Sequence, residues 1–286
     1  MKKINSFLVI GGDSRQLYVA DYLENKGYEV YIYGFDDKNR KCIDKLNCLS
    51  NITDAVVFPL PVSKDGKNIN SIIPIKESFD DILAFYNNNI IIFGGMFGKG
   101  IENKMRNKNI VYFDYFNRED VTVKNTVPTV QGILKTIIDN VDYTIHSSRC
   151  AVFGYGRVGK ITADVLASIG ADVTVCARKN SDLANVEIKK LNGCLIKDFY
   201  KHSDDYDIII NTVPSLVIDL KIIENLKKDC LIIDVSSAPY GTDFATAYNF
   251  GINAIQCPSL PGKVAPKTAG KIIGEAIVNI MKEEDL

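Results

Sequence analysis

Short apolar runs alternate with longer segments of helical periodicity along most of the chain. The apolar runs that predict strands lie at 7–10, 29–33, 55–58, 90–93, 111–113, 149–153, 172–177, 208–211, 231–235 and 254–256. Segments with apolar residues at helical spacing lie at 14–25, 77–86, 128–141, 158–168 and 265–281. Because strands that alternate with helices usually pair in parallel, this pattern predicts α/β sheets covered by helices.

The chain has 286 residues, about twice the usual length of one domain, so we expect two domains. The pattern restarts after the helix at 128–141, which has Pro128 in its first turn and Thr126 or Thr129 as a candidate cap. We predict an N-terminal Rossmann-like substrate domain over 1–127, a linker helix within 128–145 and a nucleotide-binding Rossmann domain over 146–262. The C-terminal segment, 263–286, is expected to pack back on the N-terminal domain.

Composition narrows the classes of function. Hydrophobic residues make up 46% of the chain and charged residues 24%, a balance typical of globular proteins. The net charge is −1, so no basic excess indicates a nucleic-acid partner. No apolar run approaches the ~18–20 residues of a membrane span, and the run after Met1 is too short for a secretory signal. We therefore expect a cytoplasmic protein with no membrane partner.

The cysteines and histidines show no metal-site spacing. The cysteines lie at 42, 48, 150, 176, 194, 230 and 257 without a CxxC pair, and the chain has 2 histidines. Those at 150, 176 and 230 fall within or beside apolar strand runs. We interpret them as small buried side chains in a reducing compartment, and we expect no metal.

A glycine motif carries the main chemical signal. Gly154, Gly156 and Gly159 form a GxGxxG pattern that follows the strand at 149–153 and opens the next helix. In dinucleotide-binding domains these glycines allow a tight turn, a close approach to pyrophosphate and close helix–strand packing. The alternatives are a glycine turn without a ligand, and a P-loop, which needs Ser or Thr where this chain has Ile161.

The residue after the second strand predicts which nicotinamide cofactor binds. NAD-specific sites place an Asp or Glu there to accept hydrogen bonds from the ribose 2′-hydroxyl. This chain has Ala177 followed by Arg178, and an arginine can pair with a 2′-phosphate. We therefore predict NADP(H) rather than NAD(H), with a solvated strand-end arginine as the alternative.

The ends of the predicted strands indicate which further residues contact the cofactor. Ligands of open α/β sheets bind beyond the carboxyl ends of the strands, where loops follow 208–211 and 231–235. These loops could equally be plain turns. The predicted cofactor contacts are Gly154, Tyr155, Gly156, Arg157, Val158, Gly159, Arg178, Lys179, Asn180, Asn211, Thr212, Val213, Pro214 and Ser236.

The first half has a second glycine turn, Gly11-Gly12, which lacks the third glycine of the dinucleotide motif. Asp13 or Ser14 could cap the helix that follows. Arg15 and Gln16 could instead receive a substrate carboxylate at that helix N-terminus. His146, at the start of the nucleotide domain, is a candidate for catalysis or a structural residue near the domain joint.

Several motifs together resemble the family of bacterial dipicolinate synthase A subunits. They are Val9–Asp13 with Arg15 and Gln16, Val127–Val130 with Gly132, Asp142–His146, the glycine turn with Arg157, Asn211–Ser215, Gly241–Phe244 and Leu260–Gly270. These motifs are spread over the whole chain, and the last is long enough to be specific by itself. The chain departs from the family pattern at Ala238–Gly241, where an Arg-Pro-Gly-Gly type of run is expected.

The resemblance implies an NADP-dependent sporulation enzyme on a branch of the lysine pathway, in the mother-cell cytoplasm. It implies two Rossmann-like lobes with a cleft between them, as in formate and glycerate dehydrogenases. The substrate would be dihydrodipicolinate or its hydrated 4-hydroxy precursor, and the product dipicolinate. The implied partner is a flavoprotein-like B subunit that carries any flavin, and we also expect a homo-oligomer.

A cyclic dicarboxylate needs cations and N–H donors for its two carboxylates. The candidate substrate contacts are Asp13, Arg15, Gln16, Asn125, Thr129, Gln131, Lys263 and Lys267. Lys263, His146 and Arg15 are the candidate catalytic residues. The alternatives are a non-catalytic NADP(H)-binding protein that organises or senses for a flavin-bearing partner, and a hydrolase of the adenosylhomocysteine type, which Arg178 disfavours.

Overall fold

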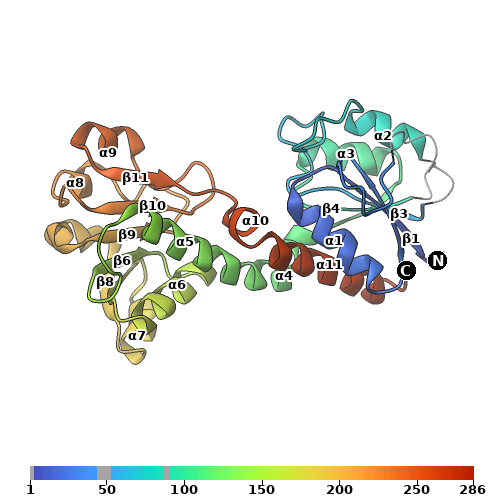
Figure 1. Cartoon of the computed structure of the whole chain (residues 1–286). Coiled ribbons are helices and arrows are strands. Elements are labelled where there is room, and N and C mark those ends of the chain that lie inside the picture. The colour runs from blue at the N-terminus through green and yellow to red at the C-terminus, as the bar shows by residue number, and fades with distance from the viewer. Residues whose placement is uncertain (1–2, 44–52, 87–89) are drawn as a thin grey trace. The chain divides into compact units, whose positions relative to one another are not determined.

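The structure is a computed structural model that describes residues 3–43, 53–86 and 90–286. Its contacts divide the chain into two compact units. The first unit contains Met1–Asn125 together with Ala265–Leu286, and the second contains Thr126–Val264. Each unit is built around its own parallel sheet (Figure 1).

The sheet of the first unit has the strand order β2-β1-β3-β4-β5, with parallel pairing throughout. Its strands are β1 (Ser6–Ile10), β2 (Glu29–Tyr33), β3 (Ala55–Val57), β4 (Ile91–Gly94) and β5 (Val111–Asp114). This is the flavodoxin-like order of doubly wound folds, in which the strand order reverses at the switch point between β1 and β3. The expected α/β class is confirmed, and the order of this sheet differs from that of the second unit.

Helices cover both faces of the first sheet, which is why β1 and β3 are apolar and buried at every position. The helical elements are α1 (Ser14–Glu24), α2 (Phe79–Phe85), α3 (Lys99–Asn107), the 3₁₀ helix η2 (Tyr115–Asn117), α4 (Glu119–Lys124) and α11 (Pro266–Glu283). Phe7 and Val9 of β1 share a core cluster with residues of α1 and α11, whereas Leu8 and Ile10 share one with α2 and α3. Successive residues of β1 therefore serve opposite faces of the sheet.

The C-terminal helix α11 lies beside α1 in the first unit (Figure 1). Two glycines one helical turn apart allow the close approach. A Cβ at Gly270 would lie 2.4 Å from the backbone oxygen of Arg15, and one at Gly274 would lie 2.6 Å from Cδ1 of Tyr22. The last segment of the chain thus completes the domain in which the chain begins.

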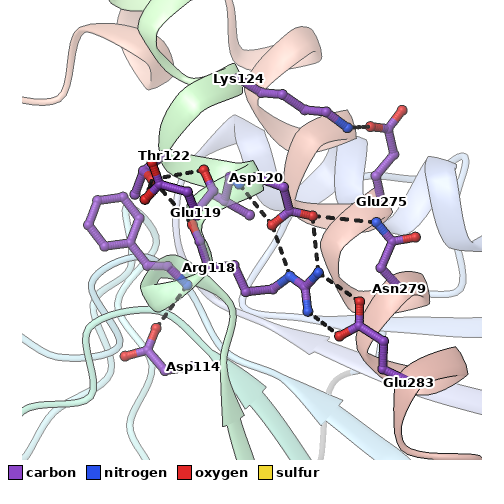
Figure 2. Close-up of polar contacts among 11 residues, drawn as sticks. Asp114, Arg118, Glu119, Asp120, Thr122, Lys124, Glu275, Asn279 and Glu283 are labelled. Carbon is purple, nitrogen blue, oxygen red and sulfur yellow. Dashed lines mark hydrogen bonds and ion pairs between the residues drawn. The ribbon is translucent and has the colours of Figure 1, made fainter. Parts of the chain in front are cut away.

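Ion pairs also hold α11 against α4 (Figure 2). The guanidinium of Arg118 donates to both carboxylate oxygens of Glu283, at 2.6 and 3.0 Å, and to both oxygens of Asp120, at 2.9 and 3.1 Å. One turn further along α4, Lys124 Nζ lies 2.7 Å from Glu275 Oε2. The hydrogen bonds from Arg118 lower the pKa of both Asp120 and Glu283 below their usual values.

We expect these carboxylates to make the first unit sensitive to acid. A carboxyl with a lowered pKa in the folded state stabilises the fold at neutral pH, and this contribution is lost as the pH falls below about 4. The urea midpoint of unfolding should therefore decrease between neutral pH and about pH 3, and decrease less steeply in Glu283→Gln.

The matched control is Glu284→Gln, which removes the next carboxylate along the chain. Its urea midpoint should follow the wild-type pH dependence. If the urea midpoint changes equally with pH in the wild type and in Glu283→Gln, the ion pair of Arg118 with Glu283 does not contribute to acid unfolding.

The sheet of the second unit has the order β11-β10-β9-β6-β7-β8, again with parallel pairing. Its strands are β6 (Arg149–Phe153), β7 (Asp172–Ala177), β8 (Asn192–Leu195), β9 (Ile208–Asn211), β10 (Leu231–Asp234) and β11 (Asn253–Gln256). This is the strand order of dinucleotide-binding Rossmann domains, with the switch point between β6 and β9.

The helical elements of the second unit are α5 (Thr126–Asn140), α6 (Arg157–Ser168), α7 (Asn180–Ile188), the 3₁₀ segment η3 (Ile196–Asp205), α8 (Leu220–Ile223), α9 (Phe244–Phe250) and α10 (Leu260–Val264). The expected linker helix is α5, and its apolar face, with Ile133 and Ile137, is buried in the core of the second unit. It therefore forms part of this domain. The segment after Pro258 contains α10, which packs on α5 at Gly132.

The interpretation of the cysteines as small buried side chains holds for Cys150, Cys176, Cys230 and Cys257. Burial raises the pKa of Cys150 and of Cys230 to about 12, so both thiols stay protonated. Cys42 is exposed and Cys194 half-buried, and Cys48 lies outside the described residues. None of the helices in the described ranges combines the length and apolarity that crossing a membrane requires.

Candidate nucleotide-binding site

A pocket of about 410 Å³ lies at the carboxyl edge of the second sheet. The turn after β6, the end of β7 and the loop after β9 form its walls. Its lining residues are Gly154, Tyr155, Gly156, Arg157, Val158, Ala177, Arg178, Lys179, Asp182, Ile196, Thr212, Val213 and Pro214. These three strands meet at the switch point of the sheet, where ligands of open α/β folds bind.

The glycine turn is tight because neighbouring backbone and side chains leave no room for a Cβ. Gly154 has a φ of +95°, and a Cβ there would lie 2.4 Å from Oγ1 of Thr212. A Cβ at Gly159 would lie 2.1 Å from the backbone oxygen of Gly154. These contacts match the turn and packing roles expected for the first and third glycines.

The middle glycine faces open space instead. A Cβ at Gly156 would have no heavy atom of the described chain within 4 Å. Gly156 is also the N-cap of α6 and, having no side chain, makes no side-chain cap hydrogen bond to the first turn of the helix. An uncapped helix N-terminus beside an open glycine suits a pyrophosphate group. The residues present therefore fit the phosphate-bearing part of a dinucleotide.

The other end of the pocket is basic. Arg178 and Lys179 follow β7, line the pocket and are exposed. Sequence reasoning missed the lining residues Asp182 and Ile196. Asp182 lies in the first turn of α7, a position that the spacing from Arg178 could have revealed, whereas Ile196 follows β8, a strand that was not predicted.

Some expected cofactor contacts lie outside the pocket lining. Gly159 packs under the turn, and Asn180 is the exposed first residue of α7. The side chains of Asn211 and Ser236 are buried and both hydrogen-bond the carboxylate of Asp234. The structure thus gives Asn211 and Ser236 a role in holding the loops beside the pocket.

Of the two roles considered for His146, the structure favours the structural one. It precedes the first residue of β6, whereas the glycine turn follows the last, and a strand of this length spans about 16 Å. Its ring packs over Gly170, where a Cβ would lie 2.3 Å from Cδ2, and its Nδ1 lies 2.9 Å from Ser147 Oγ. His146 is therefore a packing residue at the amino edge of the sheet, away from the pocket.

Lys263 is exposed on α10, in the second unit. It lies close enough to Cys257, which follows β11, for its charge to act on that thiol. Burial raises the pKa of Cys257, while the hydrogen bond with Thr136 and the charge of Lys263 oppose the rise. Lys263 thus lies toward the carboxyl edge of the sheet and is not among the residues that line the pocket.

The Arg15 guanidinium has a carboxylate partner within its own domain. Its Nε and Nη2 donate to Asp13 at 2.8 Å each, and Nη2 also donates to the backbone oxygen of Leu60 at 2.9 Å. Asp13 caps α1, as expected for one of the two candidates. The side-chain amide of Gln16 is buried and donates to the Phe58 backbone oxygen at 3.0 Å, so Gln16 has a structural role in place of the expected substrate contact.

The remaining substrate candidates are divided between the units. Asn125 is the C-cap of α4, and Lys267 is exposed in the first turn of α11. Thr129 and Gln131 lie on α5, in the second unit. Their assembly into one substrate site stays a prediction. Over 3–43, 53–86 and 90–286, no group of His, Cys, Asp and Glu side chains has the arrangement of a metal site.

Comparisons with known proteins agree with the two-unit description. The family model of the N-terminal domain of the dipicolinate synthase A subunit matches residues 6–116, and a model of NAD(P)-binding domains matches residues 143–247. The second match contains the pocket, which supports a nicotinamide cofactor.

Relatives match over nearly the whole chain. The dipicolinate synthase A subunit of Bacillus subtilis (strain 168) is 33% identical over 282 residues, which cover 96% of this chain and 95% of that protein. The crystal structure of the A subunit from Bacillus halodurans has a TM-score of 0.87 at 30% identity and covers 97% of both chains. That of the Bacillus subtilis protein has a TM-score of 0.85 at 32% identity and covers 99% of this chain and 97% of the other. The chain therefore belongs to the family of dipicolinate synthase A subunits.

Proposed function

We propose that this chain is an NADP-dependent dehydrogenase that forms dipicolinate from dihydrodipicolinate, or from its hydrated 4-hydroxy precursor, during sporulation. We propose that its partner is a flavoprotein-like B subunit. The observation that carries the proposal is the pocket after β6, with an open Gly156 at an uncapped helix N-terminus and two basic residues after β7. Membership in the family of dipicolinate synthase A subunits supports the choice of substrate.

The basic residues favour NADP over NAD. Arg178 occupies the strand-end position at which NAD-specific sites carry an acid, and Lys179 adds a second positive charge. A guanidinium can hold a 2′-phosphate through charge-assisted hydrogen bonds. Asp182, which also lines the pocket, is the acidic residue nearest to them in sequence.

The proposed reaction removes a hydride and a proton from the dihydropyridine ring and leaves the aromatic pyridine-2,6-dicarboxylate. The bound nicotinamide would supply the hydride acceptor. Because aromatisation drives this direction, the protein would contribute mainly by orienting the reactants, which can lower a barrier by roughly 7–11 kcal/mol. The candidate carboxylate ligands are Arg15, Lys263 and Lys267. If the hydrated precursor is the substrate, Lys263 is the candidate acid for loss of water.

The direct test uses the purified full chain. Binding of NADPH and of NADH is measured by nucleotide fluorescence, and NADP⁺ reduction with dihydrodipicolinate is followed at 340 nm, with and without the flavoprotein. Tight NADPH binding with an increase at 340 nm supports the dehydrogenase. Binding without any absorbance change in either assay would contradict it and favour the non-catalytic, organising role.

We expect Arg178→Ala to weaken NADPH binding by about tenfold and to leave NADH binding nearly unchanged. A charge-assisted hydrogen bond contributes about 1.5–3 kcal/mol, and the exposure of Arg178 places it at the low end of that range. The measurement is the ratio of the two dissociation constants.

Arg149→Ala is the matched control, because it removes an exposed arginine from the amino edge of the same sheet. Its ratio should equal that of the wild type. An unchanged ratio in Arg178→Ala would contradict the assignment of NADP specificity to this residue.

A further inference from the structure

Asp234 is a fully buried carboxylate at the last position of β10. Its Oδ1 accepts hydrogen bonds from the backbone N–H of Ser236 at 2.9 Å and from the Ser236 hydroxyl at 2.7 Å. Its Oδ2 accepts from Asn211 Nδ2 at 2.8 Å, the Gly241 N–H at 3.0 Å and Thr242 Oγ1 at 2.8 Å. The carboxylate thus joins the end of β9 to both ends of the loop that follows β10.

Each of these donors is neutral. A buried charge is costly unless several hydrogen bonds replace its hydration. Donation from N–H and O–H groups on both oxygens supplies that replacement and fixes the direction of every donor. An amide at position 234 would direct an NH₂ group at some of these donors, so the network depends on a carboxylate at this position.

The network continues from Asn211 into the pocket wall. The Oδ1 of Asn211 accepts from the backbone N–H of Val213 at 3.0 Å, and its Nδ2 donates to the Val213 backbone oxygen at 3.1 Å. Val213 and its neighbour Thr212 both line the pocket. Thr212 Oγ1 donates to the Phe153 backbone oxygen at 2.7 Å, directly beneath the glycine turn. Hydrogen bonds therefore lead from Asp234 through Asn211 to Val213, and the adjacent Thr212 bonds the residue just before Gly154.

The loop after β10 is held against the same segment. A Cβ at Gly241 would lie 2.3 Å from the Val213 backbone oxygen and 2.4 Å from Asn211 Nδ2. The backbone oxygen of Gly241 also accepts from the N–H groups of Val217 and Ile218, both at 2.9 Å. The segment 212–218 is thus fixed from one side by the Asp234 network and from the other by the glycine turn.

We propose that Asp234 is a positioning residue for cofactor binding, which acts through Asn211 to hold the Thr212–Pro214 wall of the pocket in its binding geometry. The proposal deepens the proposed function and rests on it. Loss of this carboxylate shifts the pocket wall and weakens cofactor binding more than its effect on folding alone would.

The test compares two carboxylates at opposite edges of one sheet. Asp207, at the amino edge, accepts from the Arg149 backbone N–H at 2.8 Å and from Lys227 Nζ at 2.7 Å. We expect both Asp234→Asn and Asp207→Asn to lower the melting temperature of the full chain. Asp234→Asn alone should raise the dissociation constant for NADPH, by about tenfold or more, since small misplacements of binding groups have effects of this size. Its kcat at saturating NADP⁺ should stay within about threefold of wild type, so that the change falls in the KM for NADP⁺.

Thr242→Val provides a milder variant if Asp234→Asn does not fold, because it removes one donor and keeps the carboxylate. We expect it to raise the dissociation constant for NADPH about threefold. If the wild type binds NADPH and the folded variants, Asp234→Asn or Thr242→Val, bind it with the same dissociation constant, the positioning role is overturned. An equal loss of affinity in Asp207→Asn would also overturn it, because general destabilisation would then explain the effect. Absence of NADPH binding by the wild type would contradict the proposed function and this inference together.

Discussion

Replacing Gly156 with alanine is expected to weaken NADPH binding by about a hundredfold without lowering the stability of the protein. The backbone of Gly156, with φ −82° and ψ −164°, suits any residue, and a Cβ there meets no heavy atom of the described chain within 4 Å. The added methyl group would instead occupy the space in front of the α6 N-terminus, where the pyrophosphate is proposed to bind. Nucleotide fluorescence titration measures the affinity, and thermal unfolding without nucleotide measures the stability.

The matched control is Gly159→Ala, in the same motif. Its Cβ would lie 2.1 Å from the Gly154 backbone oxygen, so this variant should lose stability as well as affinity. The two variants thus distinguish the proposed ligand contact of Gly156 from the packing contact of Gly159. Wild-type affinity in Gly156→Ala would show that the pyrophosphate does not approach this turn and would remove the main support for the proposed cofactor site.

Gly270→Ala is expected to destabilise the first unit by about 3 kcal/mol, which lowers the melting temperature by roughly 5–10 °C. The Cβ would lie 2.4 Å from the backbone oxygen of Arg15, and a backbone atom on a packed helix has little freedom to move away. Because α11 carries much of the apolar surface that covers one face of the first sheet, its displacement would expose that core. Differential scanning calorimetry of the full chain gives the measurement.

Gly100→Ala is the control for this second variant. Gly100 lies in α3 of the same unit, and a Cβ there has no heavy atom within 4 Å in the part of the chain that is described. Alanine in a helix is favoured over glycine by up to about 1 kcal/mol, so this variant should be as stable as wild type or slightly more stable. A melting temperature unchanged in Gly270→Ala would show that α11 can move away from α1 at no cost.

The apolar strands could be predicted because both faces of each sheet are covered. Runs such as Leu231–Asp234 are buried at every position, so they stand out in the sequence whatever their neighbours are. The edge strand β8, Asn192–Leu195, has two exposed positions and pairs only with β7 among the described strands, and it gave no such signal. The order of strands within each sheet was likewise hidden, because it depends on contacts between segments distant in sequence.

The glycine turn and the basic strand end are local features, and the sequence by itself determined them. The spacing of glycines after a buried strand indicates where the backbone turns and where it has no side chain beside a ligand. Arg178 follows β7 in the sequence, so its place at the strand end does not depend on the loops. Tertiary structure alone decided the roles of Asn211, Ser236 and His146. The first two hydrogen-bond Asp234 because β9 and β10 are neighbours in the sheet, and the ring of His146 packs over Gly170, a residue distant from it in sequence. A side chain's partners depend on which strand ends share an edge, and that arrangement exists only once the sheet has formed.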